Sequence, residues 1–293
     1  MSDPANVLRD FRPAQEFFVG IDSDGCIFDS MEIKHQECFA PCFIKHFHLQ
    51  AASKYARETW AFVNLYSKDR GANRFPALAR AVSLLGARAP VRARAVAMPD
   101  LAPLEQWMAR ESKLGNATLA AEVQRGNTGL APIQVWSNAV NAAIEDMVHG
   151  VPPFPLVREC LERIHRNADA ICISQTPSAA LRREWAEHQV DAFVRLIAGQ
   201  EMGTKTEHLR LAASGKYAPG KILMIGDAPG DFKAAKANGT LFFPINPGRE
   251  EASWERLHSE ALDRFFGGSY EGAYEAELVR EFDACLPSSP PWL

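Results

Sequence analysis

The feature that most constrains the fold is a regular alternation of short apolar runs and helical patterns in the second half of the chain. Short, continuously apolar runs are typical of strands that are buried on both faces of a parallel sheet. The expected strands are 168–174, 193–198, 221–226 and 240–244, and the expected helices are 156–167, 177–188, 205–213 and 229–238. This βαβ alternation predicts an α/β fold, a doubly wound parallel sheet with helices on both faces.

A further strand is expected far upstream, at residues 17–21, where an apolar run is stopped by an acidic turn. Between 31 and 150, apolar residues recur at helical spacing, and no segment there is typical of a strand. We therefore expect a Rossmann-like core domain made of residues 1–30 and 151–293, with a helical domain inserted at 31–150. Two helical patterns, 254–266 and 270–285, predict that a C-terminal helical extension of the core begins at about residue 250.

The composition excludes several classes of protein. With 47% hydrophobic residues and a net charge of -4, the chain is neither disordered nor a general nucleic-acid binder. No apolar run approaches the ~18 to 20 residues that span a bilayer, and the N-terminus lacks the apolar stretch of a signal peptide. The six cysteines are scattered without zinc-site spacing. We expect a cytoplasmic protein with reduced thiols that binds neither nucleic acid nor a membrane. The oligomeric state stays open.

Side chains capable of chemistry follow the expected strands at four places. In open α/β sheets, ligands bind outside the carboxyl ends of the strands, so we expect these side chains to converge. Several carboxylates in a partly dry cleft repel each other unless a cation lies among them, and an all-oxygen ligand set indicates Mg²⁺. The side chains are Asp22, Asp24, Ser174, Lys205, Asp227 and Asp231.

In this order the residues resemble the four motifs of the haloacid dehalogenase-like phosphohydrolase superfamily. The helical insert resembles the cap domain of the β-phosphoglucomutase and phosphoglycolate phosphatase branch of that superfamily. The four matching segments are Asp22-Ser23-Asp24-Gly25, Ser174 at the end of its strand, Lys205 in Gly203-Thr204-Lys205, and residues 226–231 with Asp227 and Asp231.

The resemblance implies a role for each residue and a reaction. Asp22 is the implied nucleophile, Asp24 the general acid and base, and Ser174 and Lys205 the phosphate-binding groups. A carboxylate at Asp24 favours an alkyl or sugar phosphate over the dehalogenase and phosphonatase chemistries of the family. The implied function is a Mg²⁺-dependent phosphomonoesterase that acts on a small phosphorylated metabolite through an aspartyl-phosphate. The implied metal ligands are Asp22, the backbone carbonyl of Asp24, Asp227 and, as a ligand or in support of the metal shell, Asp231.

One segment of the insert, residues 68–74, resembles the Gly-x-Ser-Arg cap loop of the β-phosphoglucomutase branch, with Asn73 in place of Ser. The resemblance implies that Arg70 or Arg74 contacts a carboxylate or a second phosphate of the substrate. A helix–loop boundary with solvated charges is the alternative interpretation.

Other interpretations also stay open. Taken singly, Asp227 is typical of a helix N-cap, Ser174 of a turn hydroxyl and Lys205 of a solvated lysine. Asp22 and Asp24 lack the further ligands of an EF-hand calcium loop. At the level of function, the alternatives are a phosphomutase of the β-phosphoglucomutase type, a receiver-like phospho-acceptor, and a non-catalytic or carbohydrate-binding scaffold.

Overall fold

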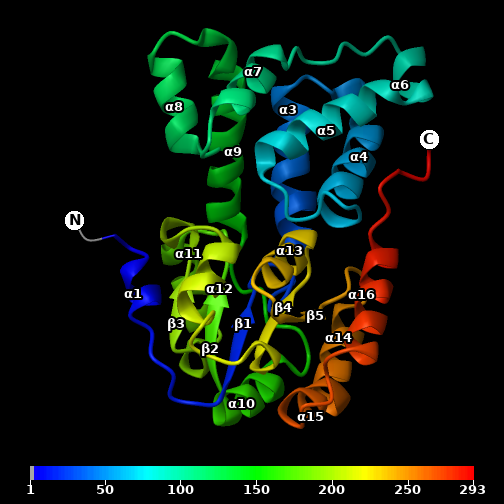
Figure 1. The fold of residues 1–293 in the computed structure, drawn as a ribbon. Helices are drawn as coiled ribbons and strands as arrows, with labels where there is room; N and C mark the ends of the chain where they lie inside the picture. The colour runs from blue at the N-terminus through cyan, green and yellow to red at the C-terminus, as the bar shows by residue number, and fades with distance from the viewer. Residues whose placement is uncertain (1–2) are drawn as a thin grey trace. The chain divides into compact units, whose positions relative to one another are not determined.

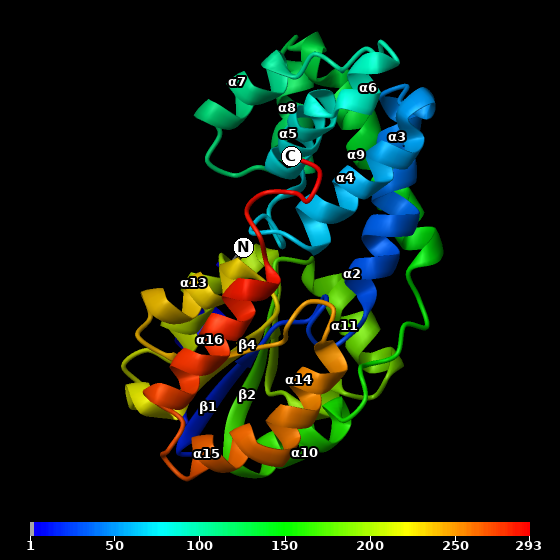
Figure 2. The same cartoon turned by 90° about the vertical axis from the view of Figure 1, so that its right-hand side faces the viewer.

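The computed structural model describes residues 3–293, and the chain divides into two compact units (Figures 1 and 2). The first, here called the core unit, runs to Ser30 and continues over Gly150–Leu286. The second, the helical unit, comprises Met31–His149 and Pro287–Leu293. The last of these segments corrects the sequence analysis, which placed residues 287–293 in the core domain.

The core unit is built on one five-stranded parallel sheet. The strands are β1 (Phe17–Ile21), β2 (Ala168–Ile173), β3 (Leu196–Ala198), β4 (Ile222–Gly226) and β5 (Leu241–Pro244). Their order in the sheet is β3-β2-β1-β4-β5, so β1 lies at the centre. Ile21, at the end of β1, pairs with Cys172 of β2 and with Ile225 of β4. The sheet thus extends in both directions from β1, which confirms the predicted doubly wound parallel fold.

Alternate residues of each strand face two different hydrophobic clusters, so the sheet is buried on both faces. In β1, Val19 and Ile21 belong to one cluster and Phe18 belongs to the other. The first cluster includes residues of α10 (Val157–Asn167), α11 (Ser178–Glu187), α14 (Glu250–Arg256) and α15 (Leu262–Phe266). The second includes residues of α1 (Asn6–Arg9), α12 (Lys205–Ala212) and α13 (Pro229–Ala237). Helices therefore cover both faces, as the alternation of strands and helices predicts.

The C-terminal extension protects one edge of this sheet. Helix α16 (Ala273–Cys285) packs against the edge strand β5. The Glu275 carboxylate accepts a hydrogen bond from the backbone N–H of Phe242 in β5 (3.0 Å), and the Tyr270 hydroxyl donates one to the Phe242 carbonyl (2.7 Å). Unpaired backbone groups on an edge strand are a template for pairing with another chain. At Phe242, hydrogen bonds with these two side chains use the backbone N–H and carbonyl that would otherwise be open to such pairing.

The helical unit has its own hydrophobic cluster, which includes the fully buried rings of Trp60, Trp107 and Trp136. The C-terminal residues group with this unit because Trp292 packs against the Phe62 ring and lies 4.1 Å from the Arg88 guanidinium. Within the described residues, no helix has both the length and the apolar character needed to cross a bilayer. The helices are α2 (Ser30–Ile33, at the start), α3 (Ala40–His46), α4 (Ser53–Leu65), α5 (Arg74–Ala87), α6 (Ala89–Ala93), α7 (Ala102–Arg110), α8 (Asn116–Gln124) and α9 (Ala131–Met147).

Some elements differ from the sequence prediction for identifiable reasons. Helix α8 lies in the insert that the sequence predicts to be helical, but its own apolar pattern is weak, because Leu119 is its one buried residue. The π-helical segment Lys34–Phe39 leads directly into helix α3, and its turn is wider than that of an α-helix. Strand β3 begins later than predicted, since Asp191–Phe193 form a short 3₁₀ turn.

The buried histidine of α12 makes the stability of the fold depend on pH. His208 is completely buried, and burial, which outweighs the attraction of Glu207, lowers its pKa from 6.5 to about 4. As the pH falls, the unfolded chain therefore binds a proton before the folded chain does. His208 thus contributes stability that is present above about pH 6.5 and is lost towards about pH 4.

We predict that, from about pH 7.5 to about pH 5, the free energy of unfolding falls by about 2 kcal/mol more in the wild-type chain than in His208→Gln. Urea unfolding of both proteins at the two pH values measures this difference. The same pH dependence in both proteins would contradict the prediction.

Candidate active site

The carboxyl end of β1 places Asp22 at the centre of the sheet edge. Its backbone N–H donates to the Ile225 carbonyl (3.0 Å), which extends the pairing of β1 with β4 by one residue. The carboxylate oxygen Oδ1 accepts a hydrogen bond from the N–H of Ser23 (2.8 Å). Asp22 is 4% exposed. The sheet therefore holds this buried carboxylate in one orientation.

Lys205 connects the two acidic segments. Its ammonium Nζ lies 2.6 Å from Asp22 Oδ2 and 2.7 Å from Asp231 Oδ1. Lys205 is the first residue of α12, whose start is defined by a capping box: the Thr204 hydroxyl accepts from the N–H of Glu207, and the Glu207 carboxylate accepts from the N–H of Thr204. The local sequence thus fixes where the helix begins and, with it, the position of the lysine.

The second acidic segment follows β4 directly. Asp227 and Asp231 are 1% and 0% exposed, and Asp231 Oδ2 accepts a hydrogen bond from the N–H of Ala228 (3.0 Å) at the start of α13. A Cβ atom at Gly226 would lie 2.4 Å from the Asp231 side chain. Glycine is therefore required at Gly226 for Asp231 to lie against the end of the strand.

The cluster brings three buried carboxylates together with one ammonium. Asp22, Asp227 and Asp231 each offer a carboxylate oxygen, and these oxygens lie within 4.8 Å of one another, with Lys205 as the ammonium between two of them. Burial raises the pKa of Asp22 well above its usual value, and the charges of Asp231 and Asp227 raise it further. Burial opposes the charged form of Lys205, but the attraction of the three carboxylates is larger and raises the pKa of the lysine above its usual value. The lysine therefore stays charged.

The donor set therefore fits a hard divalent cation. Three buried carboxylates within reach of one point offer the oxygen ligands that such a cation prefers, and its charge would favour their ionised forms. The side chain of Asp24 is not a member of this oxygen group. Its predicted metal contact is through the backbone carbonyl, and that contact stays a prediction.

Asp24 and Ser174, the other two predicted site residues of the core unit, follow β1 and β2. Asp24 accepts hydrogen bonds from hydroxyl groups, and Ser174 accepts one from a backbone N–H. The two Asp24 oxygens accept hydrogen bonds from the hydroxyls of Ser30 (2.5 Å) and Thr176 (2.8 Å). Ser174 is 2% exposed, and its hydroxyl oxygen accepts from the N–H of Thr176 (3.2 Å). Ser30 and Thr176 were not singled out from the sequence. In the sequence, the only indication of a role for these two residues is that each carries a hydroxyl and lies close to a predicted motif.

Two tryptophans support the loop of Asp22 and Asp24 from the buried side. The Trp185 indole N–H donates to the Ser23 hydroxyl (2.9 Å), and the Trp254 indole N–H donates to the carbonyl of Cys26 (2.9 Å). Both rings are fully buried. Trp254 belongs to the C-terminal extension, so this extension also contributes directly to the structure of the candidate site.

The two arginines predicted to contact substrate belong to the helical unit. Arg70 is 3% exposed and donates to the carbonyl of Leu65 (2.9 Å). Arg74 donates to the Ser137 hydroxyl (3.0 Å) and to the Asn141 side chain (2.7 Å). Burial lowers the pKa of Arg74 to about 10. These contacts lie within the helical unit, and a contact of either guanidinium group with substrate stays a prediction.

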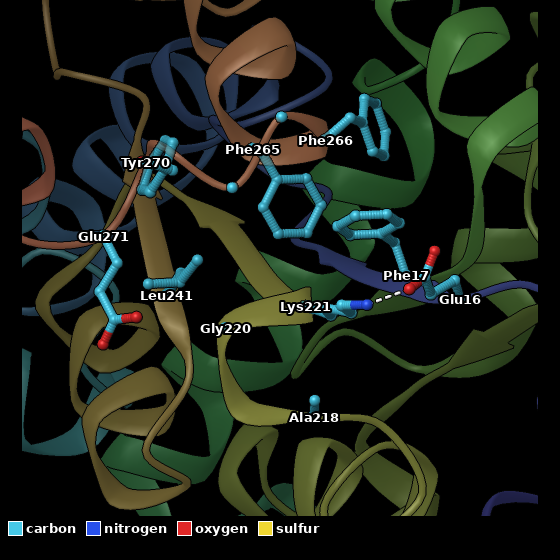
Figure 3. A pocket seen from close by; sticks show the side chains of 12 residues that line it. Glu16, Phe17, Ala218, Gly220, Lys221, Leu241, Phe265, Phe266, Tyr270 and Glu271 are labelled. Atoms are coloured by element: carbon cyan, nitrogen blue, oxygen red, sulfur yellow. Dashed lines mark hydrogen bonds and ion pairs between the residues drawn. The ribbon is translucent and has the colours of Figure 1, made fainter.

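The described surface of the core unit is also hollowed at the opposite end of the sheet. A pocket of about 400 Å³ lies where β1, β4 and β5 begin (Figure 3). Its aromatic lining includes Phe17, Phe265 and Phe266, and an ion pair joins Lys221 to Glu16 at this pocket. It contains none of the predicted catalytic residues. The chemistry-capable groups gather at the carboxyl ends of the strands instead.

Replacing the Trp254 indole tests how the extension supports the site loop. We predict that Trp254→Phe lowers the free energy of unfolding of the core unit, because the phenyl ring buries less area and the buried Cys26 carbonyl loses its donor. The loss of the donor should contribute about 1–3 kcal/mol beyond the effect of the smaller ring. Trp107→Phe is the matched control, since the Trp107 indole has no hydrogen-bond partner among the described residues. Calorimetry measures both losses, and equal losses would contradict the prediction.

Comparisons with known proteins give matches among solved structures. A scan of protein-family models and a search of curated proteins found no match. A haloacid dehalogenase-like family hydrolase from Streptococcus pneumoniae is 14% identical, with a TM-score of 0.44, over 83% of this chain and 91% of that one. A haloacid dehalogenase-like family hydrolase from Xanthomonas campestris is 13% identical, with a TM-score of 0.41, over 87% and 97%.

A third structure, described as a predicted phosphoglycolate phosphatase from Haemophilus somnus, is 14% identical, with a TM-score of 0.44, over 79% of this chain and 86% of that one. All three similarities are at low sequence identity.

Proposed function

We propose that this chain is a Mg²⁺-dependent phosphomonoesterase of the haloacid dehalogenase-like superfamily, which hydrolyses a small phosphorylated metabolite through an aspartyl-phosphate at Asp22. The observation that carries the proposal is the Lys205 ammonium, which bridges Asp22 and Asp231 beside Asp227 at the carboxyl edge of the sheet. A buried ammonium, together with a cation that the carboxylates would hold, is suited to bind a phosphate ester and to stabilise charge in its transition state.

The residues around Asp22 supply the binding site for the phosphoryl group. Lys205 and the hydroxyl of Ser174 are the candidate donors to phosphate oxygens. The buried carboxylates of Asp22, Asp227 and Asp231 are the candidate ligands of Mg²⁺. When bound, Mg²⁺ would neutralise part of the charge of the phosphate and of these carboxylates.

The first chemical step transfers the phosphoryl group to the protein. A carboxylate oxygen of Asp22 attacks phosphorus, an oxygen–phosphorus bond forms, and the ester bond to the leaving alcohol breaks. The leaving alkoxide takes a proton from Asp24, two residues further along the same loop. General acid catalysis of this kind contributes about 10²- to 10⁴-fold in rate.

The second step returns the protein to its starting state. Asp24, now a carboxylate, takes a proton from a water molecule as that water attacks the phosphorus of the aspartyl-phosphate. The bond between phosphorus and Asp22 breaks, inorganic phosphate leaves, and the Asp22 carboxylate and the protonated Asp24 are restored. The same residue thus serves as acid and then as base.

Two further expectations belong to this proposal. The helical unit, residues 31–149 with 287–293, would act as the cap domain and would supply the contacts that select the substrate. The location would be the cytoplasm, because all six cysteines are unpaired and a reducing compartment maintains free thiols.

The proposal predicts how substitution of the two loop aspartates affects phosphate release. Asp22→Asn should reduce release from para-nitrophenyl phosphate to the background rate, because the amide is not a nucleophile. Asp24→Asn should lower kcat by about 10²- to 10⁴-fold. Asp191→Asn makes the same chemical change at an exposed position of the core unit and should leave the rate unchanged. Full activity in Asp22→Asn would refute the proposal.

The proposal also predicts that Mg²⁺ stabilises the folded chain. At a concentration of about 100 times its Kd, Mg²⁺ should add about 2.7 kcal/mol to the free energy of unfolding, and EDTA should reverse this. Asp227→Asn should abolish most of the increase and Asp191→Asn should keep it. Thermal unfolding with and without MgCl₂ measures the effect. An increase that is the same in Asp227→Asn would place the metal elsewhere.

A further inference from the structure

The carboxyl group of Asp24 is held by two hydroxyls that the proposed reaction does not itself use. Ser30 Oγ lies 2.5 Å from Asp24 Oδ1, and Thr176 Oγ1 lies 2.8 Å from Asp24 Oδ2. The donors come from distant parts of the sequence, and they reach different oxygens of the same carboxyl group. Two contacts of this kind restrict rotation of the side chain about its terminal bonds.

The backbone around Thr176 fixes the position of its hydroxyl. The Thr176 N–H donates to the Ser174 hydroxyl oxygen (3.2 Å), and its carbonyl accepts from the N–H of Gln200 (3.2 Å). The turn also packs closely on Gly199, where a Cβ atom would lie 2.7 Å from the Thr176 carbonyl oxygen. Thr176 therefore joins the loop of the candidate phosphate ligand Ser174 to the candidate acid and base.

The position of Ser30 depends on the turn that follows Asp24. Gly25 has a φ of +74° and donates from its N–H to the carbonyl of Phe28 (2.9 Å). This turn reverses the chain, so that the buried Ser30 hydroxyl reaches back to Asp24. The left-handed conformation favours glycine at position 25.

Hydroxyls are suited to hold a group that gives up and regains a proton. A neutral hydroxyl can donate to an oxygen of the carboxylate or to the unprotonated oxygen of the carboxylic acid, and, unlike an ammonium, it adds no positive charge that would hold Asp24 in its ionised form. The contact between Thr176 and Asp24 therefore persists when the proton leaves Asp24 and when it returns. This property distinguishes the partners of Asp24 from the Lys205 partner of Asp22.

We propose that Thr176, together with Ser30, is a positioning residue that orients the Asp24 carboxyl group for proton transfer to the leaving alcohol. This inference rests on the proposed phosphatase function. Loss of this positioning should affect only part of the reaction, because a misdirected Asp24 slows only the steps that need proton transfer. Phosphoryl transfer from a good leaving group needs none.

The experiment compares two substrates with different leaving groups. β-Glycerophosphate releases an alkoxide that needs a proton, and para-nitrophenyl phosphate releases a stable phenolate. We expect Thr176→Val, which has the same shape without the hydroxyl, to lower kcat/KM for β-glycerophosphate by about 10- to 100-fold. For para-nitrophenyl phosphate, kcat/KM should change by less than about threefold. This parameter reflects only the steps up to release of the leaving group, and release of the phenolate needs no proton.

A second readout follows from the second step, in which Asp24 acts as the base. With para-nitrophenyl phosphate, Thr176→Val should lower kcat while kcat/KM is kept, because hydrolysis of the aspartyl-phosphate becomes rate-limiting. A burst of para-nitrophenolate equal to the enzyme concentration should then precede steady turnover. A change that only loosened the fold would not produce this burst.

Matched variants separate positioning from damage to the fold. Thr176→Ser keeps the hydroxyl and should restore most of the loss, and Ser30→Ala should show the same dependence on leaving group as Thr176→Val. Thr240→Val removes another buried hydroxyl of the core unit, which bonds to the Ala235 carbonyl, and should behave as wild type.

The outcomes distinguish this inference from the function on which it rests. Equal losses of kcat/KM on the two substrates, or no loss in Thr176→Val, would overturn the positioning role while wild-type turnover upholds the phosphatase. A wild-type chain with Mg²⁺ that releases phosphate from neither substrate would overturn both. Selective loss on β-glycerophosphate with rescue by Thr176→Ser would support both.

Discussion

The arrangement of the site depends on one buried interaction, the ammonium of Lys205 between Asp22 and Asp231. Ionised carboxylates at this depth repel one another and lose most of their hydration, so they need a fixed positive partner. The capping box of α12 supplies that partner at a defined place, and Gly226 gives Asp231 the space to reach it. The central strand β1 then brings Asp22 to the same point from a distant part of the sequence.

The fold and the polar residues at the strand ends were predictable from the sequence because each has a local signal. An apolar run followed directly by aspartate, as at Asp22 and Asp227, indicates both a strand and its functional end. The contacts of Trp185, Trp254 and Thr176 have no such signal, since their partners lie more than a hundred positions away. The contacts of Arg74 with Ser137 and Asn141 have no local signal either, since these partners lie more than sixty positions away.

The C-terminal extension illustrates how one segment serves structure and site together. Glu275 and Tyr270 occupy the backbone groups of Phe242 on the edge strand, whereas Trp254 binds the loop that follows β1. Its apolar residues complete the cluster on one face of the sheet. The extension is therefore part of the core unit, although its sequence shows only two amphipathic helices and no motif. The chain then continues to Trp292, which packs in the helical unit.

The central place of β1 has a consequence for the order in which the protein is assembled during synthesis. This strand leaves the ribosome first, but its two neighbours, β2 and β4, follow only after the whole helical insert has been made. Until then the strand has two unpaired edges and two uncovered apolar faces, the kind of segment that chaperones bind. The insert, with a hydrophobic cluster of its own, is able to collapse during this interval. Folding during synthesis therefore requires β1 to stay available for pairing until β2 and β4 have been made.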